Sequence, residues 1–244
     1  MRLGIMQPYF FPYLGHFALI NAVDQWVVFD ITQYTPKTWM NRNRILHPNA
    51  GWQYVTVPLS NSSISIKTSE AKVLNLQNAK QTTLAKLAHY KKKAPYFNQV
   101  FELVNRTFDN AIDDLLVNLN VSALSAVCDY LNIKFSFQIC SHLNLEYPLN
   151  LKAGDWAPHI CQKLGASGYV NPLGGKEIFN VADFKKREIA LYFAEFSDFK
   201  YITKPYQYEP HLSVLDVMMW NSPDDIRNVL MDNISLKKCT SQLL

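Results

Sequence analysis

The chain has 244 residues, of which 48% are hydrophobic and 18% charged, and its formal net charge at pH 7 is +4. This composition is typical of a globular protein and excludes disordered and fibrous classes. The charge is mild, no dense Lys/Arg stripe occurs, and no segment reaches the roughly 18 consecutive apolar residues of a membrane span, so we expect neither nucleic-acid binding nor a membrane span.

The first thirty residues predict a strand, a stiff loop, a helix and a second strand. Residues 3–6 are apolar, as in a buried parallel strand. Pro8 and Pro12 then exclude a regular helix or central strand, so residues 7–16 form a loop. Apolar residues recur at helical spacing over 17–23, and residues 26–30 are a second apolar run. This order predicts a βαβ unit.

The rest of the chain continues the alternation of strands and helices. We expect strands at 53–57, 72–76, 134–139, 168–171 and 189–193, and helices within 81–131 and at 155–164, 213–220 and 223–231. Ser222 before Pro223 indicates an N-cap with proline at the first helical position. The pattern predicts one α/β domain over 1–244, with a doubly wound, mostly parallel sheet, flanking helices and a helical insertion at about 78–131.

The loop after the first strand is the leading candidate site. In doubly wound sheets, ligands bind beyond the carboxyl ends of strands, where the strand order reverses. A helix starting near Gly15 would point free N–H groups at a phosphate or carboxylate there, and Gly15 would allow close approach. Gln7, Tyr9, Tyr13 and His16 supply donors and acceptors. The alternative is a set of core aromatics, which we predict for Phe10, Phe11 and Phe17.

Three further segments carry candidate binding groups. In Trp39-Met40-Asn41-Arg42-Asn43-Arg44, two amides flank a guanidinium that suits carboxylate or phosphate; the alternative is a polar turn. In Asn171-Pro172-Leu173-Gly174-Gly175, paired glycines after a strand form either an anion cradle or an ordinary turn. Asp216 interrupts an apolar helix, either as a cap or hydrogen-bonded partner or as a site group.

Nucleophiles and metal ligands give no comparable pattern. The four cysteines lack CxxC spacing, so a zinc ribbon and a disulfide framework are excluded, and a reducing cytoplasm is the default location. Cys161 lies among apolar residues and is predicted to be a small buried hydrophobe. No Ser-His-Asp order or HExxH motif occurs, and we expect no metal site.

In the segments described above and in several others, the sequence resembles the WbqC-like family. The resemblance is carried by residues 5–15 (Ile-Met-Gln-Pro-Tyr-Phe-Phe-Pro-Tyr-Leu-Gly), 20–24, 39–45, 93–97, 164–166, 171–175 and 212–216. It implies a role in bacterial O-antigen or other surface-polysaccharide biosynthesis. The implied activity is transfer of an acyl or aminoacyl group, such as glycyl, onto an amino sugar or a nucleotide-linked amino sugar. An acyl-carrier-protein thioester or a nucleotide would be the donor. Position 16, often Tyr in the family pattern, is His16 here.

A fainter similarity links Tyr13-Leu14-Gly15-His16 to the HxGH signature of nucleotidyltransferase-type α/β folds, with Tyr13 in place of the first His. Three hypotheses follow: an acyl or aminoacyl transferase, a nucleotidyltransferase, or a non-catalytic subunit that binds a carrier protein. For the first, His16, Tyr9 or Asp216 would assist deprotonation of the sugar amine. The predicted substrate-binding residues are Gln7, Pro8, Tyr13, Gly15, Asn41, Arg42, Asn43, Asn171, Gly174 and Gly175. Candidate partners are the small-molecule substrate, a carrier protein and a second copy of the chain.

Overall fold

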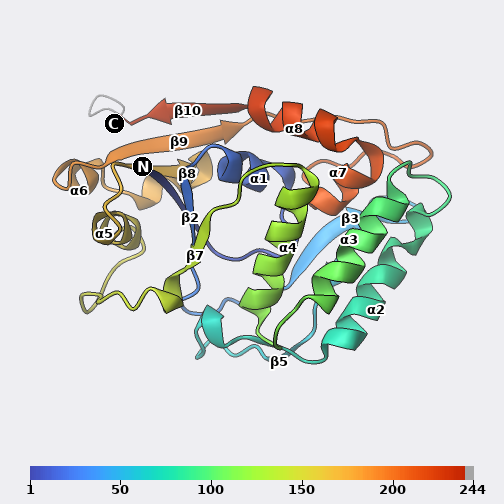
Figure 1. Ribbon diagram of the computed structural model, residues 1–244, viewed down its shortest axis with the longest axis horizontal. Coiled ribbons are helices and arrows are strands. Elements are labelled where there is room, and N and C mark those ends of the chain that lie inside the picture. The colour runs from blue at the N-terminus through green and yellow to red at the C-terminus, as the bar shows by residue number, and fades with distance from the viewer. Residues whose placement is uncertain (240–244) are drawn as a thin grey trace.

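The computed structural model describes residues 1–239 and is built around one six-stranded sheet (Figure 1). The strand order is β10-β9-β8-β1-β2-β7. All neighbours are parallel except β10, which runs antiparallel to β9. The strands are β1 (Arg2–Met6), β2 (Gln25–Val28), β7 (Phe137–Ile139), β8 (Gly168–Pro172), β9 (Ala190–Phe196) and β10 (Ile234–Lys238). The predicted α/β class with a mostly parallel sheet is confirmed.

The strand order reverses between β1 and β8. From β1 the chain adds β2 and then β7 on one side, and it returns to add β8, β9 and β10 on the other. The carboxyl ends of β1 and β8 therefore flank the crevice where doubly wound sheets bind ligands. Gln7 directly follows β1, and Asn171 lies near the end of β8.

Helices cover both faces of the sheet because alternate strand residues point to opposite faces. Leu3, Ile5 and Val27 pack with α5 (Trp156–Lys163) and α6 (Val181–Lys185) in one buried cluster. Trp26 and Val28 belong to a larger cluster on the other face. That cluster also contains α1 (Leu14–Asn21), α7 (Val214–Trp220) and α8 (Pro223–Asp232).

The segment between β2 and β7 forms the insertion. It contains the hairpin β3 (Arg42–Leu46) and β4 (Trp52–Thr56), the short pair β5 (Leu59–Asn61) and β6 (Lys72–Val73), and the helices α2 (Leu76–Leu87), α3 (Phe97–Asp109) and α4 (Leu116–Tyr130). The 3₁₀ segments are η1 (Thr68–Glu70), η2 (Ala88–Tyr90), η3 (Cys140–His142) and the longer η4 (Leu173–Ile178). Figure 1 shows α2, α3 and α4 beside one another, with α2 and α3 toward the opposite end of the molecule from α5 and α6. Within residues 1–239, no helix has the length and apolarity needed to cross a bilayer.

The element boundaries differ from the prediction in several places. The strand expected at 72–76 stops at Val73, because Asn75 caps α2 by accepting a hydrogen bond from the Asn78 N–H. The strand expected at 134–139 is confined to Phe137–Ile139. The hairpin strand β3, the helix α6 and the edge strand β10 were not predicted. The Ser222 cap is confirmed, since its side chain accepts a hydrogen bond from the Asp225 N–H.

Candidate functional site

The loop after β1 is fixed by buried amide side chains. The Nδ2 of Asn120, on α4, donates to the Pro8 carbonyl at 2.8 Å. The Nδ2 of Asn43, on β3, donates to the carbonyls of Phe10 at 3.1 Å and Phe11 at 2.9 Å. Buried backbone carbonyls need such partners, and here the insertion supplies them. The loop is therefore a preformed platform held from two distant parts of the chain.

Phe11 adopts a backbone conformation that this residue type rarely takes. Its φ is +39°, in the left-handed region, and its side chain is fully buried. Ser213 holds this conformation, because its Oγ donates to the Phe11 carbonyl at 2.6 Å. The same Oγ accepts a hydrogen bond from the Leu215 N–H and caps α7. Strain fixed from outside in this way is typical of functional loops.

A first pocket lies where the strand order reverses, and we call it the sheet-end pocket. It has a volume of about 320 Å³ and is lined by the ends of β1 and β8, by η4 and by α5. Gln7, Tyr9 and Asn171 give it polar atoms, and Trp156 and Phe179 give it aromatic surface. No charged side chain lines it within the described part of the chain. This lining suits an uncharged polar ring such as a sugar.

The two predicted glycines of the sheet-end pocket have different roles. Asn171 accepts a hydrogen bond from the Tyr169 hydroxyl at 2.8 Å and donates to the Pro172 carbonyl at 2.8 Å. A Cβ at Gly175 would collide with the Asn171 amide. A Cβ at Gly174 would meet nothing within 4 Å. Packing against Asn171 therefore requires a glycine at position 175, whereas a side chain at position 174 would extend into open space.

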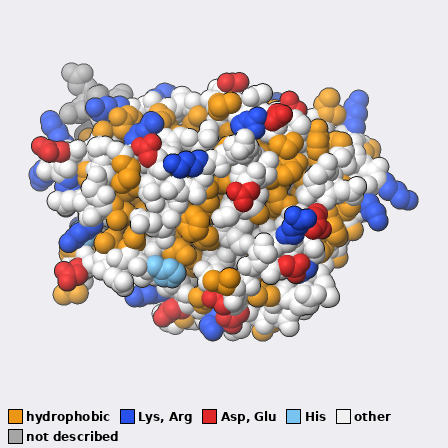
Figure 2. All heavy atoms as spheres, viewed as in Figure 1, with side chains coloured by type: hydrophobic (Ala, Val, Ile, Leu, Met, Phe, Trp, Pro, Cys, Tyr) orange, Lys and Arg blue, Asp and Glu red, His pale blue; other side chains and the backbone are white. Residues whose placement is uncertain are grey.

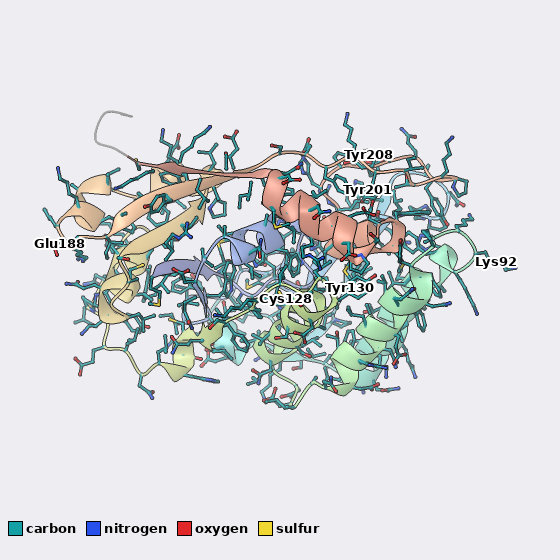
Figure 3. All side chains as sticks on the ribbon, turned by 45° about the horizontal axis from the view of Figure 1, so that its top comes forward. Lys92, Cys128, Tyr130, Glu188, Tyr201 and Tyr208 are labelled. Atoms are coloured by element: carbon teal, nitrogen blue, oxygen red, sulfur yellow. The ribbon has the colours of Figure 1, made fainter. Side chains whose placement is uncertain are left out.

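A second pocket, which we call the aromatic pocket, lies on the other side of Tyr9, and this residue lines both. The aromatic pocket has a volume of about 410 Å³. It brings together the loop after β1, the start of β3 and the segment between β9 and α7. Tyr13, Trp39, Phe199, Tyr201 and Tyr208 line it. Figure 3 shows Tyr201 and Tyr208 next to each other on the segment beside α8, and their rings meet edge to face at 5.3 Å between centroids.

Arg44 is the cation of the aromatic pocket. Its guanidinium carbon lies 5.0 Å from the Trp52 ring centroid and 5.5 Å from that of Trp39. Its NH2 group donates to the His211 carbonyl at 3.3 Å. None of the ion pairs among residues 1–239 includes Arg44, and its buried Nε has no hydrogen-bond partner there. Arg44 is therefore a half-buried charge without a counter-ion.

His211 and Asp198 lie together on the lining of the aromatic pocket. The Nδ1 of His211 is 3.6 Å from Oδ1 of Asp198, and both side chains are largely exposed. His211 has a φ of +54°, a second left-handed residue at this site. A histidine oriented by a carboxylate is an arrangement that can accept a proton.

The predicted base His16 does not line either pocket. Its side chain is buried on α1, with its ring 5.0 Å from that of Trp26 and 5.7 Å from that of Tyr9. Burial lowers the pKa of His16 to about 3, so the ring is neutral at physiological pH. Gly15 is also covered, because a Cβ there would collide with the Tyr13 ring. The start of α1 is thus occupied by the protein's own side chains.

Asp216 is a fully buried carboxylate at the centre of a hydrogen-bond network. It accepts hydrogen bonds from the hydroxyls of Tyr90 and Tyr201 and from the Leu46 N–H. Burial raises the pKa of Asp216, and the hydrogen bonds from Tyr90 and Leu46 oppose that rise. Through Tyr201, Asp216 supports one wall of the aromatic pocket without lining it.

Tyr9 and Tyr13 remain protonated phenols. Burial, with a smaller contribution from Tyr13, raises the pKa of Tyr9, and burial raises the pKa of Tyr13. A neutral phenol donates a hydrogen bond but is a poor base. Tyr9 therefore suits the role of donor to an oxygen that gains negative charge.

The predicted Asn41-Arg42-Asn43 segment is only partly at the site. The Nδ2 of Asn41 donates to the Val57 carbonyl at 3.0 Å. Arg42 lies over the Tyr54 ring at 4.3 Å, donates to the Lys37 carbonyl at 2.6 Å and lines neither pocket. Asn43 lines the aromatic pocket while its amide holds the loop. The segment and the Gly174-Gly175 turn line different pockets, which Tyr9 connects.

Sequence reasoning missed most of the aromatic pocket. The unassigned lining residues include Trp39, Arg44, Asp198, Tyr201, Tyr208 and His211. A signal was present in residues 199–208, where four aromatic side chains occur within ten residues without strand or helix periodicity. Arg44 also shares a strand face with Arg42, and that alternation is visible in the sequence.

Residues 1–239 hold no cluster of metal ligands, and the face drawn in Figure 2 shows no patch of a single charge. Within residues 1–239 no group of three or more His, Cys, Asp or Glu side chains is placed to hold a metal ion. The cysteines of this range are free, and Cys161 is buried. In Figure 2, the Lys and Arg side chains of the visible face are interspersed with Asp and Glu.

The comparisons with known proteins agree with the motif resemblance. The chain is 26% identical over 231 residues to an uncharacterized protein, Rv1507c, of Mycobacterium tuberculosis (strain ATCC 25618 / H37Rv), with 93% of this chain and 97% of that protein covered. No solved structure matches the chain. The profile of the WbqC-like protein family matches residues 7–228, which include both pockets' loops. The chain belongs to the WbqC-like family.

Proposed function

We propose that this protein is a transferase that moves an acyl or aminoacyl group, such as glycyl, onto the amine of an amino sugar in bacterial surface-polysaccharide biosynthesis in the cytoplasm. The observation that carries the proposal is the uncharged, aromatic and amide-lined sheet-end pocket where the strand order reverses. Hydroxyl and amide groups of a sugar would bond to Gln7 and Asn171, and its apolar ring face would pack on Trp156.

The reaction needs a place for a proton and a donor to an oxyanion. The amine nitrogen attacks the carbonyl carbon of an activated ester or thioester, a C–N bond forms, and the C–O or C–S bond breaks with loss of the amine proton. Tyr9, a protonated phenol between the two pockets, would donate to the carbonyl oxygen as it gains charge. The predicted bases His16 and Asp216 are buried and line neither pocket, so we assign the amine proton to solvent water.

A nucleotidyltransferase mechanism has less geometric support. It requires triphosphate at the start of α1, next to Gly15 and His16. The Tyr13 ring fills the space beside Gly15, and His16 is buried and neutral. Nucleotide binding is more plausible at Arg44, away from these residues.

The test is amide formation by the purified full chain. A glycyl thioester on a phosphopantetheine arm and a UDP-linked amino sugar with a free amine are incubated with the protein, and the product is measured by mass spectrometry. We expect an amide that is formed about 100-fold more slowly by Tyr9→Phe, which loses only the hydroxyl. Tyr130→Phe is the matched control, because its hydroxyl lacks a hydrogen-bond partner among residues 1–239 and lines neither pocket.

Absence of amide with every donor and acceptor tried, or a Tyr9→Phe rate equal to that of wild type, would contradict the proposal. A carrier-binding subunit without catalysis would give a different result. In that case Gln7→Ala and Tyr9→Phe would leave polysaccharide synthesis in the cell intact.

A further inference from the structure

We propose that the aromatic pocket binds a nucleoside diphosphate, with Arg44 on the phosphates and the surrounding aromatic rings on the base. The inference deepens the proposed function, because it makes the acceptor a nucleotide-linked sugar rather than a free one. It assigns a ligand class to Arg44 and Trp39, which were not among the predicted substrate-binding residues.

The first argument is the state of Arg44. The five N–H donors of a half-buried guanidinium need hydrogen-bond acceptors. Arg44 has one backbone carbonyl, that of His211, and two indole faces, but no ion pair within the described range. The indole faces orient the planar guanidinium, whose Nη1 group donates to no acceptor within residues 1–239. An anion that accepts two such bonds, such as a phosphate, would complete the site.

The second argument is the density of flat apolar surface around that charge. Tyr13 and Trp39 are each about two-fifths exposed (40% and 41%) although both lie at the pocket. Tyr208 and Phe199 form the facing wall, and the Tyr208 hydroxyl is fixed by donation to the Phe199 carbonyl at 3.1 Å. Aromatic side chains around a cation suit a nucleobase stacked beside its phosphates. A bare inorganic anion would leave these rings exposed to water.

The third argument is the charge balance of the pocket. Its charged or titratable lining groups other than tyrosines are Arg44, Asp198 and His211. The Nδ1 of His211 lies 3.6 Å from Oδ1 of Asp198, so an imidazole stands beside the carboxylate of this lining. Asp198 is also a suitable acceptor for ribose hydroxyls.

The fourth argument is the relation between the two pockets. The sheet-end pocket has no charged lining, the aromatic pocket has Arg44, and Tyr9 lines both. A nucleotide-linked sugar has the same division into a neutral ring and a charged, aromatic part. We therefore place the sugar in the sheet-end pocket and the nucleoside diphosphate in the aromatic pocket.

The experiment measures binding by isothermal titration calorimetry with the full chain and without acyl donor. The probes are UDP, GDP, ADP and CDP, with uridine and inorganic pyrophosphate as partial ligands. We expect at least one nucleoside diphosphate to bind more tightly than pyrophosphate or the nucleoside alone. Arg44→Gln should weaken nucleoside diphosphate binding by about 10- to 100-fold, and Arg44→Lys should weaken it by less. Trp39→Ala should weaken binding of the nucleoside diphosphate but not binding of pyrophosphate.

Arg106→Gln on α3, whose guanidinium pairs with Glu102 on the surface, is the matched control and should bind as wild type does. Circular dichroism and thermal unfolding check that each variant is folded. Three results would overturn the inference: no nucleoside diphosphate binds; binding is lost in Arg42→Gln rather than in Arg44→Gln; or pyrophosphate binds as tightly as every nucleotide and Trp39→Ala has no effect.

These outcomes are separate from those of the amide assay. Nucleotide binding without amide formation would support this inference and contradict the proposed function. Amide formation on a free amino sugar, with no nucleotide bound, would support the proposed function and contradict this inference.

Discussion

His16 illustrates how burial decides the chemistry of a single residue. A histidine on a loop near a strand end is an attractive base, but this ring packs against Trp26 and Tyr9, and its Nε2 has no hydrogen-bond partner within residues 1–239. Water cannot solvate a proton there, and burial brings the pKa of His16 to about 3. The sequence identifies the histidine, but it does not show that Trp26 and Tyr9 pack against its ring.

His16 should therefore make stability pH-dependent. Its pKa is about 3 when folded and about 6.5 when unfolded, so the unfolded chain binds the extra proton between these values. The free energy of unfolding should fall as pH decreases through this window, by about 1.4 kcal/mol per pH unit from this group. Above pH 7 its contribution is complete.

The measurement is urea unfolding of wild type and His16→Phe from pH 4 to pH 8. The phenyl ring keeps the contact with Trp26 but does not titrate. The difference in unfolding free energy between the two proteins should change with pH in the direction stated. Parallel pH profiles would show that His16 is not buried and neutral.

At the scale of elements, η4 shapes the sheet-end pocket through one close contact. Gly175 lies against the Asn171 amide, which is fixed by Tyr169 and the Pro172 carbonyl. Gly175→Ala should force that amide aside and lower the free energy of unfolding by about 1–3 kcal/mol. Gly174→Ala, next to it in the same 3₁₀ segment, should change it by about 0.5 kcal/mol or less, because its Cβ meets nothing.

Thermal and urea unfolding of the two alanine variants test this pair directly. Equal losses of stability would mean that the Asn171 amide is free to move. A loss of stability in Gly174→Ala alone would contradict the close contact that we assign to Gly175.

Elements with a clear local signal were predicted well, and those without one were not. The β1–loop–α1–β2 unit was predicted because its apolar runs, prolines and helical spacing lie within thirty residues. The strand β3 was not, because one of its faces carries Arg42 and Arg44, whose aromatic partners Tyr54 and Trp52 lie on β4. A polar strand stabilised by the next strand has little apolar alternation of its own.

At the scale of the whole molecule, the sequence predicted the sheet-end pocket better than the aromatic one. Gln7 follows β1 and Asn171 lies near the end of β8, and the carboxyl ends of parallel strands meet at the same edge of a sheet. The aromatic pocket joins residues 9–14, 39–44 and 196–217 through the contacts of Asn43 and Ser213 with the loop. No periodicity within one segment encodes such contacts, which depend on three distant parts of the chain.

The shared residue Tyr9 leads to a prediction about ligands that span both pockets. If the sugar and the nucleoside diphosphate bind on either side of Tyr9, one molecule that carries both should bind far more tightly than either part, because the second contact becomes intramolecular.

A UDP-linked amino sugar at 100 times its Kd should raise the free energy of unfolding by about 2.7 kcal/mol. At the same concentration, UDP or the free amino sugar should raise it much less. Tyr9→Ala should weaken binding of the linked ligand more than Gln7→Ala or Trp39→Ala does, since Tyr9 alone among residues 1–239 lines both pockets. Thermal shift and calorimetry with the linked ligand, the two parts and their mixture decide the matter: if the mixture stabilises the protein as much as the linked molecule does, the pockets bind independently and do not form one substrate cleft.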